Sequence, residues 1–393
     1  MQRLTGVVQH YDWGSHGALA GLRGEAATTE PEAELWLGAH PAAPSVLTES
    51  GDSLLARIET DPVGMLGGGT VERYGPRLPF LLKLLAADSP LSIQAHPSPD
   101  QAAAGFAYEE SMGIPRDASN RSFRDNSHKP ELIVSLTPFE ALVGFRDANA
   151  TADFFSALEM ETAGWLLERL DRDGPKGVVE MMLSPTVSEL DELDVTEISF
   201  QLGEACRAYE GEHWTTEASV IAKLDQKYGG DPGIVVAALL NRVLLQPGEG
   251  VYLDAGHLHA YVGGLGVEIM ANSDNVLRGG LTSKRVDVPN LLNAIVNDIL
   301  DPRPVPMTED GRYLTPAAEF ELTRIEYLAD RAVDGPAIVL AVEEDTTVSN
   351  DLAHMVLSPT EAAWIGAGEM AQVASLGLAF LATVGPTTTL IEG

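Results

Sequence analysis

The chain has 393 residues, more than one ordinary hydrophobic core accommodates, so we expect two or three domains. Hydrophobic residues make up 45% and charged residues 21%, a balance typical of a globular rather than a disordered protein. The formal net charge of −33 argues against nucleic acid and against an anionic membrane as partners, because the long-range field repels both. No apolar run has the length of a membrane span, the N-terminus lacks the apolar core of a secretory signal, and Cys206 is the single cysteine. A reducing cytoplasm is therefore the expected location.

The first 150 residues predict short strands separated by Gly and Pro, with one helical interruption. Residues 100–125 are polar and predict a helix followed by a loop. The apolar run at 81–85 fits a buried strand or a buried helix equally well. The expected strands lie at residues 6–8, 33–37, 78–85, 91–97, 131–136 and 140–145.

The pattern changes between residues 151 and 245, where apolar residues recur at helical spacing and acidic residues occupy the exposed positions. Within this stretch, residues 233–245 (GIVVAALLNRVLL) predict a buried helix. We therefore expect a helical insert that interrupts a strand-rich domain.

A second strand-rich region begins after the turn at Pro247. Residues 289–300 predict a short helix with a proline in its first turn, and DPRPVP at 301–306 predicts a linker. The residues after 317 hold no dense cluster of histidines or acids, so a structural role is expected for them. Strands are expected at residues 251–253, 266–270, 320–327, 337–342, 354–357 and 380–384.

The most informative motif is LSIQAHP at residues 91–97. Gln94 and His96 are two residues apart, so in a strand both side chains project from the same face. An imidazole nitrogen and a carboxamide oxygen aimed at one point can hold a metal ion. Taken alone, the motif fits a strand with one hydrogen-bonded polar pair better than a metal site, and the other segments decide the matter.

Two later segments supply further candidate ligands, Glu131 in HKPEL and His259 in GHLHAY. With Gln94 and His96 they offer two nitrogens and two oxygens, a set that suits Zn²⁺ with room for water or substrate and tolerates other divalent ions. His257 competes with His259, because it lies two residues earlier, and the spacing leaves the choice open.

For these side chains to meet, the strands at 91–97 and 131–136 have to be neighbours, with His259 entering from a third strand. A β-barrel or jelly roll delivers inward-facing residues in this way. His128, three residues before Glu131, is a weaker candidate ligand.

An anionic substrate would need a local cationic pocket on this acidic molecule. Three lysines, Lys83, Lys129 and Lys284, lie in the segments that we expect around the site. They are half of all the lysines, which are Lys83, Lys129, Lys176, Lys223, Lys227 and Lys284.

Several segments, taken in chain order, resemble one known family. They are YDWG (11–14), AELWLG (33–38), LSIQAHP (91–97), NSHKPEL (126–132), HAY (259–261) and ANSDNVLRGGLTSK (271–284). The family is type I phosphomannose isomerase, also called mannose-6-phosphate isomerase, and the resemblance covers nearly the whole chain.

The resemblance implies a mainly β fold with an α insert: a cupin-like jelly-roll catalytic domain, a helical domain and a second, C-terminal cupin-like β domain. The expected catalytic domain is discontinuous, because segments of the helical domain interrupt it, and the C-terminal domain follows it in the chain. The expected divisions are 1–100, 126–150 and 246–300 for the catalytic domain, 101–125 and 151–245 for the helical domain, and 301–393 for the C-terminal domain.

The resemblance also implies one Zn²⁺ per chain, held by Gln94, His96, Glu131 and His259. In the family the ligand histidine directly precedes Ala-Tyr, which favours His259 over His257 and leaves the role of His257 open. The catalytic arginine of the family matches Arg278.

The implied reaction interconverts mannose 6-phosphate and fructose 6-phosphate through an enediolate, and so supplies a precursor of GDP-mannose. It needs a base that moves a proton between C2 and C1, and cations that stabilise the enediolate. Arg278 and Lys129 are the expected cations near the reacting atoms, and Lys129 and Lys284 are the expected phosphate or oxyanion contacts. Glu268 is a candidate base, although a structural carboxylate paired with a cation fits as well. Tyr261 and Ser92 are further candidate substrate contacts.

Alternative functions carry less support from the residues. A cupin-type sugar-phosphate-binding or regulatory protein without catalysis would not need all four ligands and Arg278. An iron-dependent cupin oxygenase would need more histidines, and a fused nucleotidyltransferase would need a phosphate-cradling glycine loop that GGG at 67–69 does not provide. We expect a small sugar phosphate as the partner, no nucleic acid or membrane, and a monomer or weak homo-oligomer.

Overall fold

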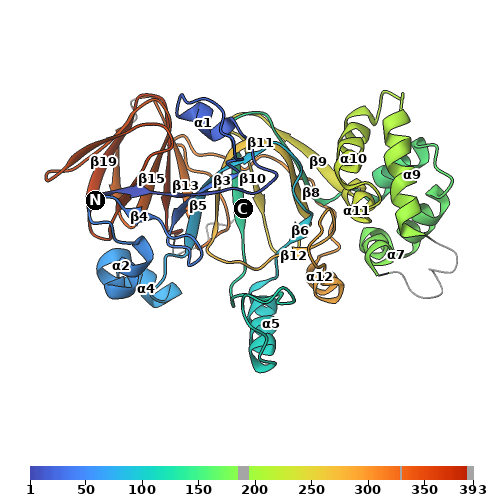
Figure 1. Ribbon diagram of the computed structural model, residues 1–393, viewed down its shortest axis with the longest axis horizontal. Helices are drawn as coiled ribbons and strands as arrows, with labels where there is room; N and C mark the ends of the chain where they lie inside the picture. Colours follow the sequence, from blue (N-terminus) through green and yellow to red (C-terminus); the bar gives the residue numbers. More distant parts are fainter. Residues whose placement is uncertain (185–193, 328–329, 387–393) are drawn as a thin grey trace.

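The structure is a computed structural model that describes residues 1–184, 194–327 and 330–386. Strands form the middle and one end of the molecule, and a group of helices forms the other end (Figure 1). The coarse prediction, a mainly β chain with a helical insert, is therefore confirmed.

The largest sheet has ten antiparallel strands and carries the predicted site segments. Its main path runs β10-β7-β11-β5-β3-β2, while β6, β8, β9 and β12 join it around the first half of β11. The strands are β2 (Val7–Gln9), β3 (Glu34–Gly38), β5 (Phe80–Ala87), β6 (Gln94–Ala95), β7 (Glu131–Ser135), β8 (Phe139–Phe145), β9 (Leu240–Leu245), β10 (Gly250–Leu253), β11 (His259–Ala271) and β12 (Leu277–Arg278).

The long strand β11 changes partners along its length. Its first residues pair with β6 and β8, and its second half, from Gly264, pairs with β5 and β7. A bulge between Tyr261 and Gly263 bends the strand where the partners change. Gly264 has a φ of +132°, and a Cβ there would lie 2.7 Å from the ring of Phe139, so only glycine fits.

The expectation that residues 91–97 and 131–136 form adjacent strands is wrong. Both segments pair with β11, at different points, and not with each other. The first of them is also shorter than expected: β6 contains only Gln94 and Ala95. Pro90 and Pro97 flank it, and proline lacks the N–H that a longer ladder needs.

A six-stranded sheet joins the two ends of the chain. Its order is β13-β20-β15-β18-β1-β4, so the first strand of the chain lies next to β18, with Leu4 opposite Ala362. The N-terminal strands β1 and β4 thus complete a sheet whose other four strands follow residue 301. A domain boundary at residue 301 would therefore separate strands that pair with one another. The strands are β1 (Gln2–Thr5), β4 (Val46–Leu47), β13 (Glu321–Glu326), β15 (Ala337–Glu343), β18 (Ala362–Ile365) and β20 (Leu378–Thr383).

One hydrophobic core spans this sheet and the largest one. It contains Phe80 and Leu132 from the large sheet and Leu4, Trp364 and Phe380 from the six-stranded sheet, all almost fully buried. Burial of such side chains stabilises each by about 1.5–3 kcal/mol relative to exposure. A third, four-stranded sheet packs on the outer side, in the order β14 (Asp330–Asp334), β19 (Met370–Ser375), β16 (Thr346–Ser349) and β17 (His354–Leu357).

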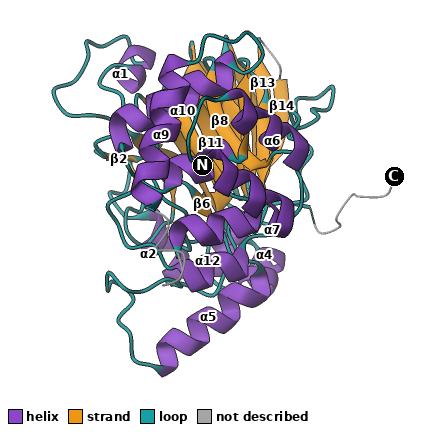
Figure 2. Ribbon diagram, turned by 90° about the vertical axis from the view of Figure 1, so that its right-hand side faces the viewer, coloured by secondary structure: helices purple, strands orange, loops and turns teal. Residues whose placement is uncertain are grey.

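The helical insert is confirmed, and it packs on β8 and β11 through a core that includes Phe154, Leu224 and Ile234. Figure 2 views this group of helices from the outside. The helices are α6 (Ala148–Ala157), α7 (Ala163–Leu183), α9 (Val195–Ala208), α10 (Thr215–Tyr228) and α11 (Gly233–Ala238). Residues 185–193 of the predicted insert, and 328–329 and 387–393 of the predicted C-terminal domain, lie outside the described residues.

The prediction of one helix over residues 233–245 is wrong in its second half. Helix α11 ends at Ala238, and residues 240–245 form β9, which pairs with β8. A short apolar run suits both structures, and here the free edge of β8 decides between them. The large sheet therefore extends directly beneath the insert.

The remaining helices are short, apart from α5, which confirms the helix predicted at the start of residues 100–125 and projects from the molecule (Figure 1). It begins at Ser98 with a capping box to Gln101 and has Pro99 in its first turn. Among the residues described, no helix has both the length and the apolar character needed to cross a membrane. The other helices are α1 (Ala18–Leu22), α2 (Leu54–Thr60), α3 (Pro62–Leu66), α4 (Gly68–Tyr74), α5 (Pro99–Ser111) and α12 (Val288–Ala294).

Candidate metal centre and substrate cavity

His96, Glu131 and His259 meet at one buried point. Their ligand atoms lie within 4.8 Å of one another, and each Nε2 lies 3.4 Å from Oε2 of Glu131. These three atoms are buried and have no hydrogen-bond partner among the described residues. Buried polar atoms without partners are costly, and here all three are electron-pair donors that point at one another. The residues present therefore fit a shared divalent metal ion.

The other ring nitrogen of each histidine is held by the backbone. Nδ1 of His96 donates to the carbonyl of Asn275 at 2.8 Å, and Nδ1 of His259 donates to the carbonyl of His257 at 3.0 Å. This fixes the tautomer in which Nε2 keeps its lone pair for a metal. Asn275 is itself held, because its side chain donates to the carbonyls of Asp125 and Ser127.

The protonation states also suit a metal site. Burial lowers the pKa of His96 to about 4, so its imidazole is neutral at neutral pH. Burial raises the pKa of Glu131, but the Lys129 ammonium, 3.0 Å from Oε1, acts in the opposite direction, and the pKa lies well below its usual range. Metal ions bind neutral imidazole and ionised carboxylate, which are the forms that these pKa shifts favour for His96 and Glu131.

Strand pairing brings Gln94 to the same place. It lies directly opposite His259 on one side and Arg278 on the other. Residues directly opposite in antiparallel strands project to the same face, so the three side chains share one face. The ring of His257 does not belong to the cluster or to the lining of the adjacent cavity. This geometry supports His259 over His257 as a ligand, and the assignment stays a prediction.

A cavity of about 470 Å³ opens beside the cluster. Its size suits a small molecule. Glu131 belongs to both the cluster and the cavity wall. The sequence-predicted site residues that line it are Ser92, Gln94, Lys129, Glu131, Tyr261, Glu268, Arg278 and Lys284.

Buried charges form one wall of this cavity. Lys83 lies opposite both Glu268 and Trp36 in register, and its Nζ is 3.0 Å from Glu268 Oε2 and 3.5 Å from Glu34 Oε1. The hydroxyl of Tyr261 donates to the other oxygen of Glu268 at 2.9 Å. Both oxygens of this carboxylate are therefore already bonded.

The environment of Glu268 affects its protonation in opposite directions. Burial raises its pKa, the Lys83 ammonium lowers it, and the carboxylate of Glu131 raises it again, so that the pKa is higher than usual. A raised pKa suits a general base, whereas the two bonds to Lys83 and Tyr261 suit a structural carboxylate. The geometry keeps both predicted roles open.

Two cations, Arg278 and Lys284, also line this cavity and form what we call its cationic wall. Burial lowers the pKa of Arg278, and the nearby guanidinium of Arg124 lowers it further; burial, Arg278 and Arg124 together lower the pKa of Lys284. Among the described residues neither Arg278 nor Lys284 has a carboxylate partner. Cations that repel one another and lack counterions on an acidic molecule favour binding of an anion.

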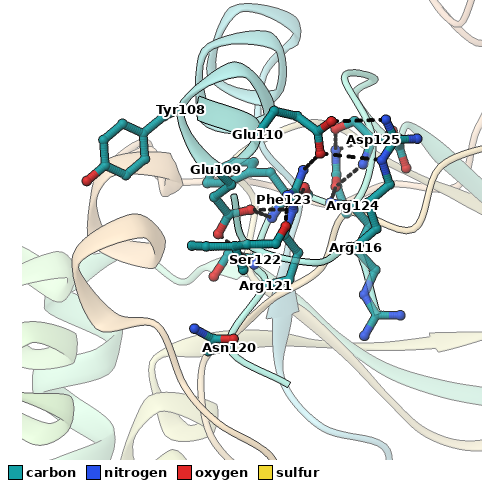
Figure 3. A network of polar contacts seen from close by, with 12 residues as sticks. Tyr108, Glu109, Glu110, Arg116, Asn120, Arg121, Ser122, Phe123, Arg124 and Asp125 are labelled. Atoms are coloured by element: carbon teal, nitrogen blue, oxygen red, sulfur yellow. Dashed lines mark hydrogen bonds and ion pairs between the residues drawn. The ribbon is translucent and has the colours of Figure 1, made fainter. Parts of the chain in front are cut away.

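Arg124 was not predicted from the sequence, and neither was Glu34. Arg124 follows a tightly held segment after α5, in which the buried Arg121 contacts Glu109 at 3.0 Å and Glu110 at 2.8 Å (Figure 3). The backbone N–H of Arg124 donates to Asn275. Arg124 lies two residues before the HKPEL-containing motif and Glu34 lies inside AELWLG, so proximity to these motifs was the available signal.

Comparison with known proteins decides the family. A model described as phosphomannose isomerase type I, catalytic domain, matches residues 1–148. The mannose-6-phosphate isomerase of Salmonella typhimurium is 36% identical over 94% of this chain and 95% of its own length, and that of Escherichia coli is 37% identical with the same coverage. The chain belongs to the type I phosphomannose isomerase family.

Solved structures of phosphomannose isomerases agree with this assignment. A mannose 6-phosphate isomerase bound with zinc and yttrium superposes with a TM-score of 0.86 at 33% identity, covering 98% of this chain and 100% of the other. A zinc-bound structure described as mannose 6-phosphate isomerase (holo) superposes with a TM-score of 0.87. The family resemblance seen in the sequence is thus confirmed.

Proposed function

We propose that this chain interconverts mannose 6-phosphate and fructose 6-phosphate in the cavity beside His96, Glu131 and His259, with one zinc ion per chain. The observation that carries the proposal is the set of three buried, unpartnered ligand atoms at the edge of a cavity with a cationic wall. The alternative of a catalytically silent binding protein is not favoured, because relatives that match nearly the whole chain are named as isomerases.

The zinc ligands in this proposal are Gln94, His96, Glu131 and His259. A zinc ion bound there polarises substrate oxygens and so favours loss of the adjacent proton. Gln94 lies in register opposite His259, which supports its place in the set. The carbonyls of Asn275 and His257 orient the two imidazoles.

The cationic wall is the proposed phosphate and oxyanion region. A phosphate monoester carries about −1.5 to −2 charges at pH 7, so Lys284 and Arg124 bind it by charge. Ser92, on the cavity wall, can donate a hydrogen bond. Arg278, opposite Gln94, stabilises the enediolate charge, and Lys129, held by Glu131, faces the same space.

Proton transfer is assigned to Glu268 as candidate base. To accept the C2 proton, one of its oxygens has to exchange its bond with Tyr261 or Lys83 for one with the substrate. Tyr261 then remains a donor that orients the substrate or the carboxylate. Retention of both bonds during turnover would leave Glu268 as a structural carboxylate.

The finer fold assignments belong to the same proposal. The two β regions are taken as cupin-like, with the divisions 1–100, 126–150 and 246–300 for the catalytic domain, 101–125 and 151–245 for the helical domain, and 301–393 for the C-terminal domain. The pairing of β1 with β18 extends the last of these by the first strand of the chain. A monomer or weak homo-oligomer is the expected state. The expected location is the cytoplasm, which the single, unpaired cysteine supports.

The direct test combines an isomerase assay with elemental analysis. Purified protein incubated with mannose 6-phosphate should form fructose 6-phosphate, and it should contain about one zinc ion per chain. Protein that binds zinc and the phosphosugar but forms no product would instead favour the silent binding protein.

Whether His259 or His257 is the zinc ligand can be tested by substitution. His257→Ala should retain its zinc and most of its activity, because the hydrogen bond that orients His259 goes to the backbone carbonyl of residue 257, and alanine keeps that carbonyl. Zinc content measured on the purified variant decides the matter. Loss of the ion from His257→Ala, with retention in His259→Ala, would show that the wrong histidine was chosen.

The phosphate region predicts a change in substrate affinity. Lys284→Ala should raise KM for mannose 6-phosphate about tenfold or more and leave the melting temperature nearly unchanged, because Lys284 is exposed and has no ion-pair partner in the part of the chain that the structure describes. Steady-state kinetics and a thermal melt measure the two effects. An unchanged KM would exclude Lys284 from the phosphate region.

A further inference from the structure

The loop that carries the cationic wall has an unusual backbone. This anion loop, residues 278–284, begins at Arg278 and ends at Lys284. Leu281 in its middle is buried and has a φ of +55°, a left-handed conformation that side chains disfavour. Gly280 before it has a φ of +114°. A loop with such a backbone keeps its shape only if its surroundings hold it there.

Asp231, from the helical insert, holds this loop. Its Oδ1 accepts the backbone N–H of Leu281 at 3.1 Å, and its Oδ2 accepts that of Thr282 at 3.2 Å. The same carboxylate accepts the N–H of Gly233 at 2.7 Å, which fixes its own orientation. The donors are thus the two residues at and after the left-handed position, where the loop most needs a restraint.

Two glycines let the insert and the loop approach closely. A Cβ on Gly280 would lie 2.4 Å from Cα of Gly233, and a Cβ on Gly233 would lie 2.5 Å from the nitrogen of Leu281. On its other side the loop pairs with Ile93, next to the candidate ligand Gln94, through bonds of 2.8 and 3.1 Å. The anion loop is therefore fixed between the insert and β6.

The same turn of the insert also contacts the other rim of the cavity. This clamp turn, residues 227–233, includes Lys227, whose Nζ donates to Oγ of Ser89 at 2.6 Å, and Tyr228, whose hydroxyl donates to the carbonyl of Pro90 at 2.8 Å. Lys227 and Tyr228 line the cavity together with residues 281–284. One turn of the insert thus contacts both residues 89–90 and residues 281–282, next to the cavity.

We propose that Asp231 is a positioning residue for substrate: through its bonds to Leu281 and Thr282, it holds the second half of the anion loop so that Lys284 faces the cavity, whereas Arg278 is held by the pairing of β12 with β6. The helical insert then contributes to recognition of the phosphosugar without contacting its phosphate. This inference rests on the proposed function, since it takes the anion loop as the phosphate region.

The test uses three variants and one matched control. Asp231→Ala removes both bonds to the loop. Asp231→Asn keeps one carbonyl oxygen and should have an intermediate effect. Gly280→Ala leaves Asp231 unchanged but pushes the loop away from the insert, because the added Cβ clashes with Gly233. Asp147→Ala is the control, because Asp147 likewise accepts two backbone N–H groups in the same insert, at the start of α6, and does not line the cavity.

The measurements are kcat and KM for mannose 6-phosphate, the dissociation constant of inorganic phosphate by calorimetry, zinc content and melting temperature. Asp231→Ala and Gly280→Ala should raise KM and the phosphate dissociation constant together, by about tenfold or more, with kcat and zinc content changing much less. Asp147→Ala should lower only the melting temperature.

Two results would overturn the inference. One is that Asp231→Asn and Gly280→Ala both keep the KM and the phosphate affinity of the wild type. These two variants are sufficient for the test if Asp231→Ala does not fold. The other is a loss of kcat that follows the melting temperature, with KM unchanged, as a purely structural aspartate would give. Failure of the proposed function looks different: the wild-type protein itself would form no fructose 6-phosphate, while the phosphate measurements would still compare the variants.

Discussion

His96→Ala should lose most of its zinc and nearly all isomerase activity at the same time. The substitution removes one of two imidazoles whose Nε2 atoms face Glu131, and alanine supplies no donor in their place. Loss of an orienting contact alone typically costs 10- to 100-fold in metal affinity, so loss of the ligand should cost about 100-fold or more. Elemental analysis after dialysis, together with the isomerase assay, measures both effects.

A thermal melt separates metal loss from misfolding. Zinc binds the folded state, so adding it should raise the melting temperature of the wild-type apoprotein and leave that of His96→Ala nearly unchanged. His96 is fully buried, so His96→Asn, which leaves a smaller void, is the companion variant. Full zinc occupancy in both variants would remove His96 from the ligand set, whatever happens to activity.

The parts of the site that sequence reasoning located are those with local signals. Gln94 and His96 share a face because they are two residues apart, and each of the single ligands Glu131 and His259 stands in a recognisable motif. In the structure Gln94 and Glu131 line the cavity, and Glu131 also meets His96 and His259 in the buried cluster. The assignment of all four as ligands stays a prediction. Local spacing was enough because the short strands project alternate residues to the same face, whichever strands lie next to them.

The contacts that the sequence did not reveal depend on distant pairing. Lys83 meets Glu34 and Glu268, which are 49 and 185 residues away, only because β5 lies between β3 and β11. No local pattern specifies which strands pair across such separations. The pairing of β1 with β18 was missed for the same reason.

The error at residues 240–245 has a related cause. The run from Gly233 to Leu245 is apolar except for Asn241 and Arg242, so helical and strand periodicity are hard to distinguish within it. Helix α11 ends once the chain reaches the edge of β8, where backbone N–H and C=O groups need partners. Hydrogen bonding to the backbone groups of β8, and not the secondary-structure propensity of residues 240–245, therefore determines where the helix ends and the strand begins.

The last prediction concerns catalysis by Arg278. Arg278→Ala should lower kcat much more than it raises KM, because the guanidinium acts where enediolate charge develops in the transition state. A loss of about a hundredfold or more corresponds to the roughly 3 kcal/mol typical of one deleted transition-state donor. Lys284 and Arg124 remain to bind the phosphate, which is why KM should change less.

Its controls follow from the chemistry of the side chain. Zinc content should be unchanged, because arginine does not ligate the ion in this position and Gln94, its neighbour in register, is retained. Arg278→Lys should recover only part of the activity, because an ammonium lacks the planar fork of donors.

If Arg278→Ala raises KM alone and leaves kcat intact, Arg278 is a phosphate anchor. Glu268, whose two oxygens already bind Lys83 and Tyr261, then becomes the next residue to test, and Glu268→Gln separates its charge from its hydrogen bonds.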